Sequence, residues 1–164
     1  MAKQYAVLMV CMGNICRSPT AEGVLRAHLQ QAGLAGQVAV DSAGTHGYHI
    51  GEAPDPRSSK AALQRGYDLS AQRARQVSAA DFQRFDLILA ADRANMTALR
   101  ALCPPDRVAR LDFILAPLGQ VPVLEVPDPY YGGAGGFDRV LDLIEQASAL
   151  WVDRLRQTLS MAAD

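Results

Sequence analysis

The sequence lacks a long apolar run, an excess of one charge and a cysteine framework. Its N-terminal apolar stretch, residues 5–10, is too short for a secretion signal or for the roughly 20 residues of a membrane span. Basic and acidic side chains nearly cancel, to a formal net charge of −1 at pH 7, whereas nucleic acids and anionic membranes attract basic surfaces. We therefore expect a cytoplasmic protein with no nucleic-acid partner and no membrane partner.

The three cysteines, Cys11, Cys16 and Cys103, fit neither a disulfide-stapled scaffold nor a zinc site. A structural zinc site needs two close pairs of ligands, and no second cysteine or histidine pair accompanies Cys11 and Cys16. The glycine patterns of Walker-type phosphate loops and of dinucleotide-binding folds are missing as well. We expect reduced thiols, no metal and no cofactor.

Apolar strand-like segments alternate with amphipathic helical segments along a chain of 164 residues, which is long enough for one core and short for two. This pattern predicts a single domain over residues 1–164 with an α/β fold, a four-stranded parallel doubly wound sheet flanked by helices. The predicted strands are 5–10, 38–40, 85–90 and 108–114. The predicted helices are 18–32, 55–65, 92–103 and 137–159, with a short helical turn near 79–82 and an irregular loop over 45–54.

The loop after the first strand carries a Cys-x5-Arg-Ser run, from Cys11 to Ser18. Ligands of parallel sheets bind at the carboxyl ends of strands, so this loop is the expected site. We predict that Ser18 caps the following helix and that Pro19 is its first residue. The free N–H groups of a helix start and the guanidinium of Arg17 would then bind a dianion such as phosphate.

The same surroundings favour the thiolate form of Cys11, which is the nucleophilic form. The hydroxyl of Ser18 is close enough in sequence to donate to that sulfur. Gly13 and Asn14 suit a tightly curled loop, since both tolerate a positive φ. The alternative is a buried structural thiol followed by a solvated arginine.

Asp128 lies between two prolines, which fix it on an extended segment. A phenolate leaves phosphorus poorly unless it is protonated, so an aspartic acid aimed at the site could serve as general acid and then activate water. The alternative is an ordinary Asp-Pro turn.

Together, the segments Cys11-Met12-Gly13-Asn14-Ile15-Cys16-Arg17-Ser18-Pro19 and Asp128-Pro129-Tyr130-Tyr131 resemble the low-molecular-weight protein tyrosine phosphatases. Residues 41–44, 55–57, 74–76 and 92–95 match further landmarks of this family in order. The resemblance implies hydrolysis of phosphotyrosine and aryl phosphates through a phosphocysteine on Cys11, with Arg17 binding phosphate and Asp128 as general acid and base. It also implies substrate contacts from Met12, Gly13, Asn14, Ile15, Cys16, Ser18, Tyr48, Tyr130 and Tyr131, with Ser42 and Asn95 supporting the loop.

The resemblance further implies phosphotyrosine-containing proteins as partners, inorganic phosphate as product and a monomer or weak homo-oligomer. The chain departs from the family pattern at three positions. Many relatives carry histidine at Gln72, tryptophan at Tyr48 and leucine at Met12. The tyrosine is expected to alter substrate preference.

Two other classes stay open, a thiol redox enzyme such as an arsenate reductase and a non-catalytic phosphate-binding module. Ile15 disfavours an arginine phosphatase, which resembles this family but carries threonine there. Cys103 is poorly placed as a redox relay, because it ends a helix beside two prolines. Cys16 is a candidate to trap an oxidised Cys11 as a disulfide, or simply packs in the loop.

Overall fold

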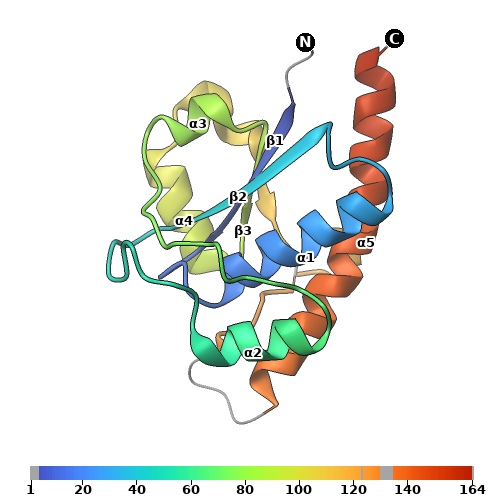
Figure 1. Cartoon of the computed structure of the whole chain (residues 1–164). Coiled ribbons are helices and arrows are strands. Elements are labelled where there is room, and N and C mark those ends of the chain that lie inside the picture. The colour runs from blue at the N-terminus through green and yellow to red at the C-terminus, as the bar shows by residue number, and fades with distance from the viewer. Residues whose placement is uncertain (1–3, 123, 130–134, 164) are drawn as a thin grey trace.

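The computed structural model describes residues 4–122, 124–129 and 135–163. It contains one four-stranded parallel sheet in the order β2-β1-β3-β4, which confirms the predicted fold class. Figure 1 shows α1 and α5 side by side on one face of this sheet and α3 and α4 on the other. The elements are β1 (Tyr5–Cys11), α1 (Arg17–Gln31), β2 (Val38–Gly44), α2 (Pro56–Gln64), α3 (Asp81–Arg84), β3 (Leu87–Ala90), α4 (Arg93–Leu102), β4 (Leu111–Phe113) and α5 (Gly136–Ala163).

Strand β1 is apolar throughout because it lies in the middle of the sheet and is covered on both faces. Val7, Met9 and Cys11 belong to the core formed with α1 and α5, while the residues between them belong to the core formed with α3 and α4. Cys11 is thus the last residue of β1 and faces the side of the sheet where α1 begins. No helix in the described part of the chain has the length and apolar character needed to cross a bilayer.

The start of α1 differs from the prediction. The helix begins at Arg17, Cys16 occupies the N-cap position, and no side chain caps it. Ser18 therefore does not cap the helix, and Pro19 is not its first residue. The hydroxyl of Ser18 lies instead against Cys11 and Asn14. It is therefore not available to cap the helix.

The predicted ends of α2 and α4 are confirmed, whereas α5 begins one residue earlier and ends four residues later than the predicted 137–159. Asp55 caps α2 by accepting the N–H of Arg57 over 2.8 Å, and Asp92 caps α4 by accepting the N–H of Asn95 over 2.8 Å. Gly33 and Gly66 follow α1 and α2 with positive φ values of 75° and 90°. Residues 45–54 form no helix or strand.

The last strand is shorter than predicted. Only Leu111–Phe113 pairs with β3, and Pro105–Arg110 forms a 3-10 helix, because proline favours a helical turn and cannot donate to a sheet. Strand β3 likewise begins at Leu87 rather than at residue 85, since Phe85 ends α3. Strands β1 and β2 extend beyond their predicted ends to Cys11 and Gly44.

The end of β2 touches the loop that follows β1, and this contact requires glycine. A methyl group on Gly44 would lie 2.7 Å from the carbonyl oxygen of Met12 and 3.0 Å from that of His46. Both are backbone atoms, so the overlap can be relieved only by moving the loop.

We predict that Gly44→Ala lowers the free energy of unfolding by about 1–3 kcal/mol, as expected for overpacking, and that urea denaturation measures this loss. Gly36→Ala is the matched control, because nothing lies within 4 Å of the added methyl. Equal stability of the two variants would contradict the proposed close approach.

Candidate active site

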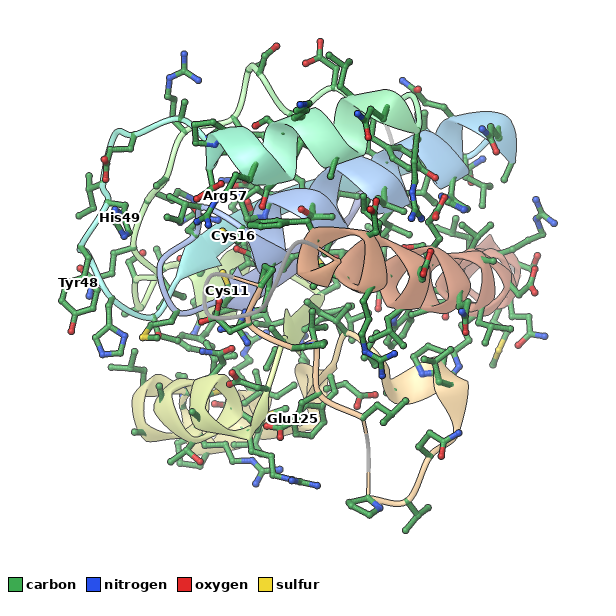
Figure 2. The ribbon with its side chains drawn as sticks, turned by 90° about the horizontal axis from the view of Figure 1, so that it is seen from below. Cys11, Cys16, Tyr48, His49, Arg57 and Glu125 are labelled. Carbon is green, nitrogen blue, oxygen red and sulfur yellow. The ribbon has the colours of Figure 1, made fainter. Side chains whose placement is uncertain are left out.

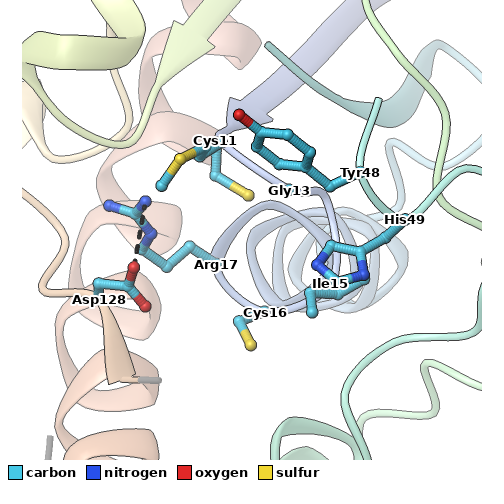
Figure 3. A pocket seen from close by; sticks show the side chains of 9 residues that line it. Cys11, Gly13, Ile15, Cys16, Arg17, Tyr48, His49 and Asp128 are labelled. Carbon is cyan, nitrogen blue, oxygen red and sulfur yellow. Dashed lines mark ion pairs between the residues drawn. The ribbon is translucent and has the colours of Figure 1, made fainter. Parts of the chain in front are cut away.

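A pocket of about 260 Å³ lies at the carboxyl end of β1 (Figure 3). Most of the residues that the sequence analysis selected meet there. The lining residues are Cys11, Met12, Gly13, Ile15, Cys16, Arg17, Tyr48, His49 and Asp128. Asn14, Ser18 and Ser42 contact one another behind the loop, and Tyr130 and Tyr131 lie outside the described residues.

The backbone N–H groups that follow Met12 in this loop lack acceptors in the described part of the chain. None of the N–H groups of residues 13–18 donates to a residue that the structure describes. Asn14 has φ 59°, the left-handed conformation that curls the chain. Consecutive free amides at the start of α1 form a site for an anion.

The carbonyl groups of Cys11, Met12 and Ile15 are bound to neighbouring segments. Thr45 donates its N–H to Cys11 O over 2.9 Å, His46 donates to Met12 O over 3.0 Å, and Asp55 donates to Ile15 O over 2.8 Å. The carbonyls are therefore committed to the protein while the amides of residues 13–18 stay available for an anion.

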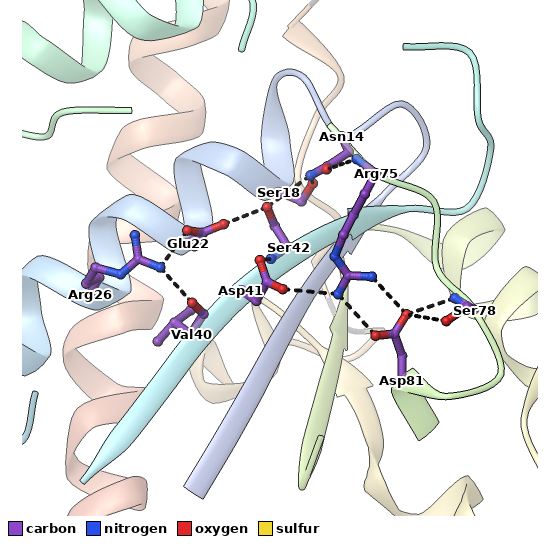
Figure 4. Close-up of polar contacts among 10 residues, drawn as sticks. All are labelled: Asn14, Ser18, Glu22, Arg26, Val40, Asp41, Ser42, Arg75, Ser78 and Asp81. Atoms are coloured by element: carbon purple, nitrogen blue, oxygen red, sulfur yellow. Dashed lines mark hydrogen bonds and ion pairs between the residues drawn. The ribbon is translucent and has the colours of Figure 1, made fainter. Parts of the chain in front are cut away.

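The Cys11 sulfur lies 3.0 Å from Ser18 Oγ. Asn14 donates from Nδ2 to Ser18 Oγ over 2.8 Å and to Ser42 Oγ over 3.0 Å (Figure 4). Its Oδ1 accepts the backbone N–H of Arg75 over 3.0 Å. The side chain of Asn14 thus joins the loop to β2 and to the segment after α2.

Arg17 lies buried beside the sulfur and is held from one side. Its Nη1 donates to Asp92 Oδ2 over 2.7 Å and to Val126 O over 3.1 Å, while Nη2 lies 4.0 Å from Asp128 Oδ2. Burial alone would lower the pKa of Arg17, but the negative charges of Cys11, Asp92 and Asp128 raise it. Arg17 therefore stays charged, with one edge fixed and the other turned to the pocket.

Asn95 links the same carboxylate to the loop. With its amide nitrogen turned to Asp92 Oδ1 at 2.9 Å, its oxygen accepts the N–H of Met12 over 3.3 Å. The sequence analysis predicted a helix from residue 92 and matched residues 92–95 to a family landmark, but it gave Asp92 no role at the site. Its position directly after β3, at the carboxyl end of the sheet, was the available signal for a role at the site.

Tyr48 and His49 form the wall opposite Asp128. Tyr48 is 71% exposed (Figure 2). Its ring stacks on the ring of His46 with 5.1 Å between the ring centroids. His49 was missed by the sequence analysis. Its ring lies 3.0 Å from where a methyl group on Gly13 would be, and its Nδ1 is 2.6 Å from Glu52 Oε2.

Cys16 lines the pocket as a neutral thiol. Burial raises its pKa to about 12, and nearby Asp55 and Asp128 add to the effect. Such a thiol is a slow nucleophile at neutral pH. In the described part of the chain, no cluster of three or more histidine, cysteine or acidic side chains is placed to hold a metal ion.

Comparison with known proteins gives the family. A sequence profile described as low molecular weight phosphotyrosine protein phosphatase matches residues 6–161. The chain belongs to this family. It is 47% identical over 147 residues to the low molecular weight protein-tyrosine-phosphatase of Streptomyces coelicolor, which covers 88% of this chain and 89% of that protein. The chain is accordingly a protein-tyrosine-phosphatase, a hydrolase of phosphotyrosine.

Solved structures of this phosphatase family share the fold. The protein tyrosine phosphatase of Entamoeba histolytica with Hepes in its active site matches with a TM-score of 0.90 at 38% identity, over 94% of this chain and 99% of that one. Vibrio vulnificus Wzb in complex with benzylphosphonate matches with a TM-score of 0.80 at 27% identity, over 93% and 99%.

The contact between Arg17 and Asp92 yields a prediction for this phosphatase. Asp92→Asn keeps a capping side chain but removes the charge that holds Arg17, so kcat/KM for an aryl phosphate should fall about tenfold. Asp92→Ala should lose a similar factor in kcat/KM and, because the α4 cap is also lost, about 1 kcal/mol of stability. Steady-state kinetics and urea denaturation measure the two effects separately. Wild-type kcat/KM in Asp92→Asn would show that Arg17 is positioned without the ion pair.

Proposed function

We propose that this phosphatase hydrolyses phosphotyrosine in proteins, and aryl phosphates, through a phosphocysteine on Cys11, with Arg17 binding phosphate and Asp128 as general acid and base. The observation that carries the proposal is the position of the Cys11 sulfur beside a loop whose amides at residues 13–18 have no acceptor among the described residues, with Arg17 and Asp128 in the same pocket. A binding module would need the amides and the arginine but no acid facing them.

In the first step, the Cys11 thiolate attacks phosphorus and an S–P bond forms as the bond from phosphorus to the tyrosine oxygen breaks. The leaving oxygen takes a proton from Asp128, which becomes a carboxylate. The loop amides and Arg17 Nη2 stabilise the charge on the phosphoryl oxygens, because they already point where that charge develops.

In the second step, Asp128 takes a proton from water as the water attacks the phosphocysteine. The S–P bond breaks, its electron pair returns to sulfur, and inorganic phosphate leaves. Ser18, 3.0 Å from the sulfur, donates its hydroxyl to the developing thiolate. One carboxyl group thus serves both steps in opposite protonation states.

The walls of the pocket support a preference for aromatic phosphates. Tyr48, His49 and Ile15 line one side, so a phosphophenyl ring can pack there while its phosphate reaches Cys11. The shorter phosphoserine would leave these contacts unmade. The complex of Wzb with benzylphosphonate, an aromatic phosphonate on the same fold, agrees with this proposal.

We further propose that the whole chain forms one phosphatase domain and works in the cytoplasm as a monomer or weak homo-oligomer. The family profile spans residues 6–161, and Cys11, Cys16 and Cys103 are all free thiols, as expected in a reducing compartment. Met12, at the pocket edge, lies where a bound phosphoprotein would pass.

Two variants test the mechanism with an aryl phosphate and with a phosphotyrosine peptide. Cys11→Ser removes the nucleophile, so turnover should fall by about 10⁴-fold or more. Asp128→Asn keeps the nucleophile but removes the acid, so kcat should fall by about 10²–10⁴-fold. Rapid acid quench of the wild type should trap phosphate on Cys11, as mass spectrometry can show.

The same assays separate the open alternatives. Reduction of arsenate coupled to a thiol donor, without phosphate release, would indicate a redox enzyme. Binding of phosphate by the wild type without any turnover would indicate a binding module. Either result would overturn the proposed mechanism.

Selectivity is tested at Tyr48. Tyr48→Ala should lower kcat/KM for a phosphotyrosine peptide by about tenfold and leave a small alkyl phosphate unchanged, because only the aromatic substrate loses a packing surface. Ile50→Ala is the matched control, since Ile50 is 61% exposed two residues away and does not line the pocket. An equal loss for both substrates would argue against a ring-packing role.

A further inference from the structure

Helix α1 carries a buried carboxylate, Glu22, that the proposed reaction does not use. Glu22 is only 4% exposed. Ser42 Oγ donates to Glu22 Oε1 over 2.7 Å, and Arg26 Nη2 lies 2.6 Å from Glu22 Oε2. Burial raises the pKa of Glu22, while Ser42 and Arg26 act to lower it and the charge of Asp41 to raise it. A carboxylate kept in such a place needs a reason, because burying a charge is costly.

The hydrogen bonds that lead from Glu22 to Ser18 have a fixed direction, and Asn14 sets it (Figure 4). Ser18 in turn lies against the Cys11 sulfur. Its Oδ1 faces the backbone N–H of Arg75 at 3.0 Å, which can only donate. The amide is therefore held with Nδ2 toward the two serines, at 2.8 Å from Ser18 Oγ and 3.0 Å from Ser42 Oγ. Since an amide nitrogen only donates, both serine oxygens must accept.

Each serine must then donate its own hydroxyl hydrogen elsewhere. Ser42 has Glu22 Oε1 as its acceptor. Ser18 is fully buried, and among the described residues the only remaining neighbour of its hydroxyl is the Cys11 sulfur at 3.0 Å. The hydrogen bonds therefore run from Asn14 in two directions. They end on the Glu22 carboxylate on one side and on the Cys11 sulfur on the other.

We propose that Glu22 is a positioning residue for the reaction at Cys11, acting through Ser42 and Asn14. By accepting the hydroxyl hydrogen of Ser42, Glu22 keeps the Ser42 oxygen facing Asn14 as an acceptor. The Asn14 amide then stays aligned, and the hydroxyl of Ser18 is left with the sulfur as its acceptor. This inference rests on the proposed phosphocysteine mechanism, in which that sulfur is nucleophile and leaving group.

Without an acceptor at residue 22, the Ser42 hydrogen loses its buried partner. The hydroxyl then rotates to find another one, and Asn14 loses a well-directed acceptor. We expect this loss to slow the chemical steps and to leave substrate binding unchanged, since neither Glu22 nor Ser42 lines the pocket. A change in kcat with little change in KM is therefore the signature of this role.

Two substitutions separate the effect of the hydrogen-bond acceptor at residue 22 from the effect of its buried charge. Glu22→Met and Glu22→Gln are similar in size and both remove the charge, but only glutamine keeps an oxygen that Ser42 can donate to. Arg26 has a half-exposed side chain, so it can turn to solvent when glutamine is present. We expect Glu22→Met to lower kcat for an aryl phosphate about fivefold to tenfold with KM within about twofold, and Glu22→Gln to recover most of kcat.

A double-mutant cycle tests the route through Ser42. Ser42→Ala should reproduce the loss in kcat, and Glu22→Met added to Ser42→Ala should cost nothing more, because the acceptor then has no donor to serve. Alkylation of Cys11 by iodoacetate, located by mass spectrometry, should slow in Glu22→Met and in Ser42→Ala. Urea denaturation of each variant reports stability separately.

The results distinguish this inference from the mechanism on which it rests. Wild-type protein without aryl phosphatase activity would overturn the proposed function. An active wild type with equal kcat in Glu22→Met, equal losses in the glutamine and methionine variants, or additive losses with Ser42→Ala would overturn the role of Glu22 alone.

Discussion

The side-chain oxygen of Asn14 accepts the backbone N–H of Arg75, and the backbone of Asn14 is left-handed with φ 59°. The two facts depend on each other. A left-handed residue curls the loop so that the amides of residues 13–18 have no acceptor within the described part of the chain. Few side chains tolerate that conformation without a hydrogen bond to hold it. The amide nitrogen of Asn14 meanwhile directs the hydroxyl of Ser18 to Cys11. Loop shape and sulfur environment therefore depend on the same side chain.

The charged side chains of the site are positioned by the segments that follow strands β1 and β3. Arg17 comes from the start of α1, Asp92 follows β3, and Val126, whose carbonyl accepts from Arg17, donates its own N–H to Ala91 O over 2.8 Å. The buried guanidinium is thus held on its Nη1 side by groups that lie just beyond the end of β3. The cost of burying this charge is offset by a carboxylate and a carbonyl, and the remaining edge is the one that we propose binds phosphate.

Much of this arrangement follows from the sequence. Periodicity and the glycine and proline positions predict the parallel α/β sheet, the first loop and the helices that begin near residues 55 and 92, because local rules decide them. The errors have tertiary causes. Ser18 is a good cap by composition, yet its hydroxyl is committed to Cys11 and Asn14. Glu22 and His49 were missed since a buried carboxylate and a wall residue are defined by contacts with distant segments.

The two thiols of the loop lie close together in the sequence but have different surroundings. Cys11 and Cys16 are five residues apart, and both are buried. Cys16 sits at the N-cap position of α1, where burial raises its pKa to about 12 and the carboxylates of Asp55 and Asp128 oppose a second negative charge. The sulfur of Cys11 instead has the hydroxyl of Ser18 at 3.0 Å and the positive charge of Arg17 nearby. The proposed chemistry therefore uses the first cysteine of this loop, while the second is a neutral thiol.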